Sequence, residues 1–249
     1  MVLEKPTVLV VVAHPDDEAI WMGCTLLKLR QSCKLAFMVA TNADNPIRSH
    51  EFGLVMESFS SPYRMLNNQD AGHLHLPNFD KEINDFVGSL GSRPVLLVTH
   101  SPNGNESSHP QHVSCFRRCF SWAKKRGVPM AFVESEPIPE LELKPGLHRE
   151  FFATKLRSDH IWITIAEYKQ KSRSPLRWFR LLMKWYRTLP YYRIFDRCVK
   201  IPADESKKNL YSYYKSQDLK PYRAYNTKEE YLHFQSKDEQ IIERALHMS

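Results

Sequence analysis

The sequence predicts an α/β fold in which helices cover both faces of a mostly parallel sheet. The prediction depends first on four continuous apolar segments, which lie at 7–13, 34–41, 94–99 and 128–133. They are rich in β-branched residues and do not alternate with polar ones, as is typical of strands that are buried on both faces. The second observation is that helical patterns separate these segments, and such alternation favours right-handed crossovers between parallel strands.

The helices follow from the spacing of apolar residues between the predicted strands. They span 18–29, 48–59, 81–90 and 110–126, and a loop-rich stretch separates the second from the third. Pro110 supports the last of them because proline is favoured in a first helical turn. Further along, we expect a connecting loop at 134–145, a strand at 160–165 and a helix at 204–217.

Length and composition indicate one domain. The chain has 249 residues, 42% of them hydrophobic, which is enough to bury a substantial core. We expect a single domain over 1–249, with a core at about 5–170 and a basic, aromatic elaboration of helices and loops at about 171–249. The first apolar segment is too short to span a bilayer and lacks a signal-peptide cleavage pattern, so secretion is not expected.

The charge balance and the cysteines narrow the class of partner and the compartment. The formal net charge of +7 indicates an anionic partner, such as a phosphorylated substrate, an acidic membrane surface or nucleic acid. The five cysteines form no C-x-x-C pair, which speaks against both a disulfide framework and a cysteine-type zinc site. A reducing cytoplasm is therefore the expected compartment.

A cluster of ionisable residues follows the first predicted strand. Ligands of parallel sheets bind beyond the carboxyl ends of the strands, which is where His14, Asp16, Asp17 and Glu18 stand. His14 and Asp17 offer an imidazole and a carboxylate to one cation, a mixture that suits Zn²⁺ or Fe²⁺. Asp16 would then be free to take a proton from water. The alternative is that these residues only cap the next helix, but so many ionisable side chains would repel and desolvate one another without a cation.

A second polar segment follows the strand predicted at 94–99. It contains His109 and His112, three positions apart at the predicted start of a helix, where neighbouring side chains share a face. One of them would complete the metal site and the other would address the substrate. His73 and His75 lie in a loop with no partner pattern, so we expect them at the surface or behind the metal ligands.

Together these motifs resemble those of the PIG-L or LmbE-like N-acetylglucosamine deacetylase family. The resemblance is carried by Ala13-His14-Pro15-Asp16-Asp17-Glu18 and Ser108-His109-Pro110-Gln111-His112. Further matches follow in family order at Thr41-Asn42-Ala43, Arg48 with Glu51, Gly104-Asn105-Glu106, Lys208 with Leu210, and Ser216-Gln217. The resemblance covers most of residues 5–220 and implies a Rossmann-like three-layer sandwich.

The resemblance also implies roles for individual residues. It implies a zinc site with His14, Asp17 and His112 as ligands, and Fe²⁺ as the alternative metal. Asp16 would be the general base that deprotonates the metal-bound water, and a protonated His109 would help to stabilise the oxyanion. The implied substrate-binding residues are Arg48, Asn42, Glu106 and Gln217.

Two positions depart from the family pattern. Gln111 stands where many members have Asp, and a neutral amide does not raise the basicity of a neighbouring histidine as a carboxylate does. This bears on the protonation of His109. Ala43 and Asp44 occupy the region of a usual glycine, which bears on substrate geometry.

The resemblance implies a metal-dependent hydrolase that removes the acetyl group from an N-acetylated sugar in glycoconjugate or glycolipid biosynthesis. Two alternatives stay open: an amide hydrolase with a non-sugar N-acyl substrate, and a membrane- or nucleic-acid-binding protein whose site is unused. A binding protein has no need of a complete hydrolytic set, so nucleic acid is not expected as a partner.

Basic residues recur with helical spacing at Arg173, Arg177, Arg180, Lys184 and Arg187. In a helix they would form one cationic stripe, with Trp and Tyr rings on the remaining surface. One interpretation is a peripheral contact of 173–187 with anionic head groups at the inner face of a membrane. The other is an ordinary helix that packs on the core and exposes a solvated basic face. The sequence does not define an oligomeric state.

Overall fold

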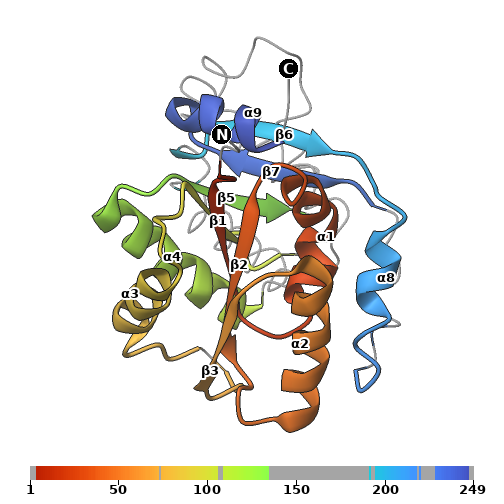
Figure 1. The fold of residues 1–249 in the computed structure, drawn as a ribbon. Coiled ribbons are helices and arrows are strands. Elements are labelled where there is room, and N and C mark those ends of the chain that lie inside the picture. The colour runs from red at the N-terminus through yellow and green to blue at the C-terminus, as the bar shows by residue number, and fades with distance from the viewer. Residues whose placement is uncertain are drawn as a thin grey trace, which may run out of the picture.

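The computed structural model describes residues 4–72, 74–105, 109–134, 191, 194–217, 219 and 228–246. Within these residues a single sheet has seven strands in the order β3-β2-β1-β4-β5-β7-β6 (Figure 1). Because strands from the beginning and the end of the chain join the same sheet, the described parts form one architecture around it.

Five neighbouring strands of this sheet are parallel. They are β1 Thr7–Val12, β2 Lys34–Thr41, β3 Tyr63–Asn68, β4 Leu96–His100 and β5 Met130–Glu134. β1 lies at the centre, paired with β2 on one side and β4 on the other, and all of its residues are buried. The predicted α/β fold with a mostly parallel sheet is therefore confirmed.

Helices cover both faces of the sheet and give three layers (Figure 1). One face packs against α1 Asp17–Leu29, α2 Pro46–Phe59, α8 Lys207–Tyr211 and α9 Glu239–Leu246. The other face packs against α3 Phe79–Ser89 and α4 Pro110–Arg126. Successive side chains of β1 alternate between the two layers, with Val8 and Val10 in the first and Leu9 and Val11 in the second.

The C-terminal region contributes two strands that the sequence analysis did not predict. β7 Glu230–Phe234 pairs antiparallel with β5, and β6 Arg197–Ile201 pairs antiparallel with β7. β6 is an outer strand with partly exposed residues, so its sequence lacks the continuous apolar run that identifies a central strand. The short 3₁₀ helix η3 Ser236–Asp238 then leads into α9.

Other differences from the sequence analysis have similar causes. The stretch predicted to be a loop before α3 contains β3, an outer strand in which only Leu66 is buried. The helix predicted at 204–217 is limited to the short α8, and the chain continues as turns. The strand at 160–165 and the basic stripe at 173–187 lie outside the described residues. Among the helices that the structure describes, none is both long and apolar enough to cross a bilayer.

Candidate metal and catalytic site

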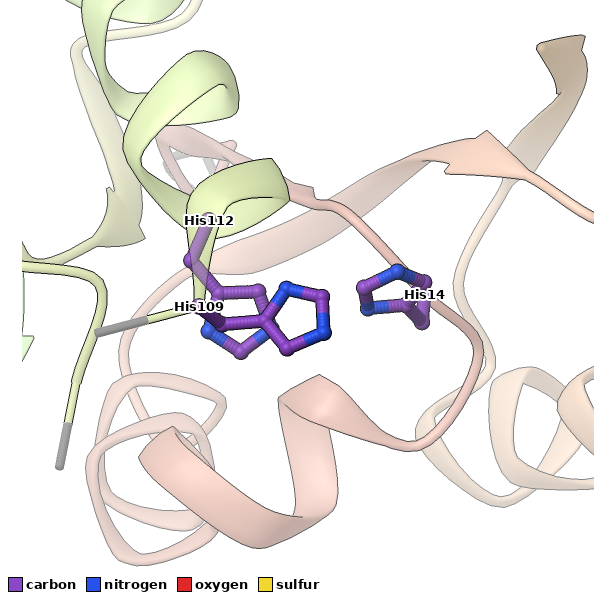
Figure 2. A group of neighbouring side chains, drawn as sticks. All are labelled: His14, His109 and His112. Atoms are coloured by element: carbon purple, nitrogen blue, oxygen red, sulfur yellow. The ribbon is translucent and has the colours of Figure 1, made fainter. Parts of the chain in front are cut away.

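The two histidine motifs meet at one edge of the sheet because β1 and β4 are adjacent and parallel. The loop after β1 carries His14, and Pro110 begins α4, which places His109 and His112 at its first turn. Figure 2 shows the His109 and His112 rings stacked on one another, with the His14 ring facing them. The ring centroids are 5.0 Å apart for His14 and His109 and 4.6 Å apart for His109 and His112. The structure thus brings together residues nearly a hundred positions apart in the chain.

Asp17 lies between the other two predicted metal ligands. Its Oδ2 is 3.1 Å from His14 Nδ1, and its Oδ1 is 3.1 Å from His112 Nε2. The backbone N–H of His14 also donates to Asp17 Oδ2 at 2.7 Å, which fixes the carboxylate. Burial raises the pKa of Asp17, but the surrounding histidines outweigh this effect and hold the pKa well below its usual range.

His100, at the end of β4, is a member of this cluster that the sequence analysis left without a role. It is fully buried, and its Nε2 accepts the N–H of Ala13 at 2.9 Å. The proton is therefore on Nδ1, which donates to Asn105 Oδ1 at 3.1 Å. Although His100 Nε2 is also 3.3 Å from Asp17 Oδ2, its lone pair is occupied by Ala13, so His100 supports the site instead of offering a free ligand atom.

Asn105 also fixes the tautomer of His112. Its Oδ1 lies 3.2 Å from His112 Nδ1, so that nitrogen carries the proton and donates. Burial lowers the pKa of His112 to about 4, so the ring is neutral near pH 7. The bare Nε2 then faces the ionised Asp17 Oδ1, and two acceptors at this distance need a cation between them.

The donor set therefore fits a divalent metal. Ligand atoms of two trios lie within 4.8 Å of one another: His14, His109 and His112, and Asp17, His100 and His112. His112 belongs to both, and imidazole with carboxylate is the mixture that Zn²⁺ and Fe²⁺ accept. His109 Nδ1 is in addition buried with no hydrogen-bond partner among the described residues. These observations support a metal beside His112, the histidine that both trios share.

Asp16 is buried beside the cluster, and its side chain does not cap α1. Burial raises its pKa well above the usual range, the neighbouring Asp17 carboxylate raises it further, and Arg48 opposes the shift. Its backbone has a φ of 128°, in the region that favours glycine. A carboxyl group with a raised pKa, next to a cation site, is suited to accept and return a proton.

Three of the four residues predicted to bind substrate lie together at this edge of the sheet. Arg48 Nη2 donates to Pro15 O at 2.9 Å and to Gln217 Oε1 at 3.1 Å. Asn42 Nδ2 donates to Asp70 Oδ2 at 3.0 Å, and Arg48 Nη1 is 3.4 Å from the same oxygen. Arg48 Nε is buried without a partner among the described residues. The fourth predicted residue, Glu106, lies outside the described residues.

Asp70 is a site residue that the sequence analysis missed. Its Oδ1 is 3.3 Å from His14 Nε2, and hydrogen bonding to His14 is the main cause that lowers its pKa. Asp70 follows β3, and no motif in the sequence marks it. Of the two histidines expected away from the centre, His75 is exposed and His73 lies outside the described residues.

Gln111 contacts His14 Nε2, and its effect on the protonation of His109 stays a prediction. With its nitrogen turned toward Asp70 Oδ1 at 3.0 Å, its oxygen accepts the N–H of Ala71 at 3.0 Å. Burial and then the charge of His14 lower the pKa of His109. The resting site therefore favours a neutral His109, and a protonated His109 stays a prediction for the reaction itself.

Comparison with known proteins points to one family. Residues 9–123 match the family model PIG-L, described as GlcNAc-PI de-N-acetylase. The chain is 24% identical over 207 residues to the 1D-myo-inositol 2-acetamido-2-deoxy-alpha-D-glucopyranoside deacetylase of Corynebacterium diphtheriae, a match that covers 62% of this chain and 67% of that protein.

Solved structures with a similar arrangement include two deacetylases. One is the N,N'-diacetylchitobiose deacetylase from Pyrococcus horikoshii, with a TM-score of 0.42 and 17% identity over 55% of this chain and 65% of that chain. The other is the deacetylase of the antimicrobial reagent A40926 pseudoaglycone, with a TM-score of 0.44 and 12% identity over 93% of this chain and 97% of that chain.

Proposed function

Because residues 9–123 match the PIG-L family model, we propose that the chain is a metal-dependent N-deacetylase of the PIG-L and LmbE-like family that hydrolyses the amide of an N-acetylated sugar. The observation that carries the proposal is the pair of facing acceptors, His112 Nε2 and Asp17 Oδ1, with Asp16 beside them. The Corynebacterium diphtheriae relative, whose name describes removal of an acetyl group from a glucosamine derivative, supports the choice of substrate. We place the reaction in glycoconjugate or glycolipid biosynthesis.

His14, Asp17 and His112 would hold the metal, with Zn²⁺ as the first choice and Fe²⁺ as the alternative. When bound, the metal would supply a Lewis acid that polarises the acetyl carbonyl and makes water more acidic. The chain supports this role because Asn105 holds the His112 tautomer, and because Asp70, to which Gln111 donates, accepts from the outer nitrogen of His14.

Asp16 would move the protons. Its raised pKa makes the carboxylate a stronger base than an exposed aspartate, so it can take a proton from the attacking water. The same group, now protonated, can return that proton to the departing amine, whose release leaves acetate and the free amino sugar. His109, whose rim position leaves it partly exposed, would face the carbonyl oxygen and stabilise its developing charge.

Arg48 would orient the sugar at the entrance. Pro15 O and Gln217 fix one of its terminal nitrogens, while Nε stays free to donate to a hydroxyl or phosphate oxygen. Asn42 and Glu106 are further candidates for substrate contacts. We also place the protein in the cytoplasm, with the segment 173–187 meeting the inner face of a membrane when the substrate is linked to lipid.

The test is amine release from a panel of N-acetylglucosamine conjugates and, as a second arm, non-sugar N-acyl amides. The protein is assayed as purified, after chelation, after zinc is restored, and as Asp16→Asn. We expect sugar deacetylation that requires both metal and Asp16. If only the non-sugar amides release amine, the substrate is a non-sugar N-acyl compound and not an N-acetylated sugar. If the fully metallated protein is inactive on every compound, the proposed function is wrong.

A further inference from the structure

The segment that follows α8 docks directly on the loop that carries His14, Asp16 and Asp17. This segment, 212–217, lies well beyond the part of the chain that matches the family model. Tyr214 is buried, and its hydroxyl donates to Glu18 Oε1. Gln217 Nε2 donates to Pro15 O at 3.1 Å. Two side chains of the C-terminal region thus reach the first motif.

Glu18 relays the contact of Tyr214 to the backbone of Asp16. Glu18 is completely buried, and its second oxygen, Oε2, accepts the N–H of Asp16 at 3.1 Å. Each of its oxygens therefore has a defined donor: the Tyr214 hydroxyl on one side and the Asp16 amide on the other. Because a buried carboxylate loses much free energy when a donor is missing, this arrangement resists rotation of the Glu18 side chain.

Both ends of a single peptide unit are held in this way. The Pro15 carbonyl and the Asp16 N–H belong to the same planar peptide. The carbonyl oxygen accepts from Gln217 Nε2 and from Arg48 Nη2, while the N–H donates to Glu18. Rotation of this peptide would break all three hydrogen bonds at once.

The conformation that is held is an unfavourable one. Asp16 has φ 128° and ψ −25°, a region that residues with a side chain rarely adopt and that persists only when the surroundings enforce it. On its other side, the Asp16 carbonyl accepts from Ala19 N at 3.0 Å and Ile20 N at 2.9 Å, which ties it to the start of α1. The direction of the Asp16 side chain therefore depends on the orientation of the Pro15–Asp16 peptide.

We propose that Tyr214 is a positioning residue for Asp16, acting through Glu18 and together with Gln217 to lock the Pro15–Asp16 peptide and aim the Asp16 carboxylate. The inference rests on the proposed function for the role of Asp16 as the general base. It gives the C-terminal segment a part in the reaction without contact with the substrate. A substrate contact of Gln217 itself stays a prediction, since its amide is used within the protein.

The test compares Tyr214→Phe with the wild type by two independent measurements. The first is amide hydrogen exchange of Asp16, with and without zinc, which reports on the peptide whether or not the protein has activity. We expect exchange about tenfold faster or more in the variant, because Glu18 loses the donor that holds it. The second is steady-state kinetics, where we expect kcat to fall by about 10- to 100-fold with KM and zinc affinity within about twofold, since only the alignment of the base changes.

The matched control is Tyr213→Phe. Tyr213 packs against the same apolar cluster and is not part of the path from Tyr214 to Asp16. We expect its exchange, kcat and KM to equal those of the wild type. Equal losses in both variants would mean general softening of the segment and would overturn the inference, as would unchanged Asp16 exchange and kcat in Tyr214→Phe.

A second variant keeps the inference testable if Tyr214→Phe does not fold. Glu18→Gln retains an oxygen for the Asp16 N–H and offers its amide nitrogen to the Tyr214 oxygen, so exchange should stay within about threefold of the wild type. Exchange as fast as in an unstructured peptide would contradict the lock. If wild-type protein deacetylates no compound of the panel, the proposed function fails, while the exchange measurement still decides whether Tyr214 holds Asp16.

Discussion

Two buried polar clusters include residues of α1, one at its first residue, Asp17, and the other at Cys24 and Thr25, and they differ in whether their charges are satisfied. The metal cluster consists of His14, Asp17, His100 and His112. The Lys207 cluster consists of Lys207, Glu230, Cys24 and Thr25. In the second, Lys207 Nζ is 2.8 Å from Glu230 Oε1, and the other Glu230 oxygen accepts from Thr25 N and Thr25 Oγ1, each at 2.7 Å.

The difference separates a structural cluster from a functional one. Glu230 also accepts from Cys24 N at 2.9 Å, so it binds N–H groups next to the kink at Met22 of α1. Its charge and its lone pairs are all used inside the protein. In the metal cluster, by contrast, the bare His112 Nε2 faces Asp17 Oδ1, and a third partner is required. Burial alone does not indicate a site; an incomplete set of partners does.

Asp17→Asn should have the largest effect, and it acts on the metal cluster. The amide keeps the shape but removes the charge that a cation needs, so we expect zinc affinity to fall by about 10⁴-fold, which corresponds to about 5.6 kcal/mol. Amine release should fall below detection. Competition with a chromogenic chelator measures the affinity, and Asp80→Asn on the exposed surface of α3 is the matched control. Tight zinc binding by Asp17→Asn would remove Asp17 from the ligand set.

Lys207→Met should act on the Lys207 cluster and lower the stability of the fold without changing zinc affinity. It leaves Glu230 buried without its cation, which we expect to lower the free energy of unfolding by about 3–5 kcal/mol. Urea denaturation measures this loss. Lys125→Met, which breaks the exposed ion pair with Asp80, should change little. The comparison of the two clusters would be wrong if Lys207→Met kept its stability but lost zinc affinity.

The sequence was sufficient for the central strands and for the two motifs, because both signals are local. Continuous apolar runs identified β1, β2, β4 and β5, and abrupt polar residues after β1 and β4 located His14, Asp17 and His112. β3 and β6, the two outermost strands, and β7, which lies between β5 and β6, were missed because polar or charged residues interrupt all three segments and leave no continuous apolar run.

The missed site residues depend on contacts between distant segments. Asp70 follows the unpredicted β3, and Tyr214 meets Glu18 across 196 positions, so neither has a pattern in its own surroundings. His100 had a signal: like His14, it is a polar residue at the carboxyl end of a buried strand. Its role, however, follows from the Ala13 N–H that occupies its Nε2, which only the structure shows.

Asn105→Gly should have an intermediate effect on zinc binding by the metal cluster. Asn105 has φ 63°, which glycine adopts without strain, so the variant removes the side-chain oxygen and little else. His100 and His112 then lose the acceptor that fixes their tautomers, and we expect zinc affinity to fall by about 10- to 100-fold. Asn105→Asp, which keeps an acceptor in place, should stay close to the wild type. If both variants bind zinc equally well, the tautomers are fixed by other groups.

The smallest expected effect is the pH dependence of zinc binding, which reports whether His14 is protonated in the metal-free metal cluster. Burial lowers the pKa of His14, but the charge of Asp17 and the hydrogen bonds that the ring donates to Asp17 and Asp70 outweigh this effect and raise the pKa to about 11. This pKa lies above the unfolded value near 6.5, so the protonated ring stabilises the metal-free protein fully below pH 6.5, and that stability is lost as pH rises through 11. Binding a cation through His14 must release this proton, whereas His112, with a pKa of about 4, is already neutral.

Zinc affinity should therefore rise by up to about tenfold per pH unit between pH 6.5 and 8.5, as calorimetry in buffers of different ionisation enthalpy would measure. The exposed-histidine variant His75→Ala should show the same slope, and a flat profile in the wild type would mean that His14 is neutral before the metal binds.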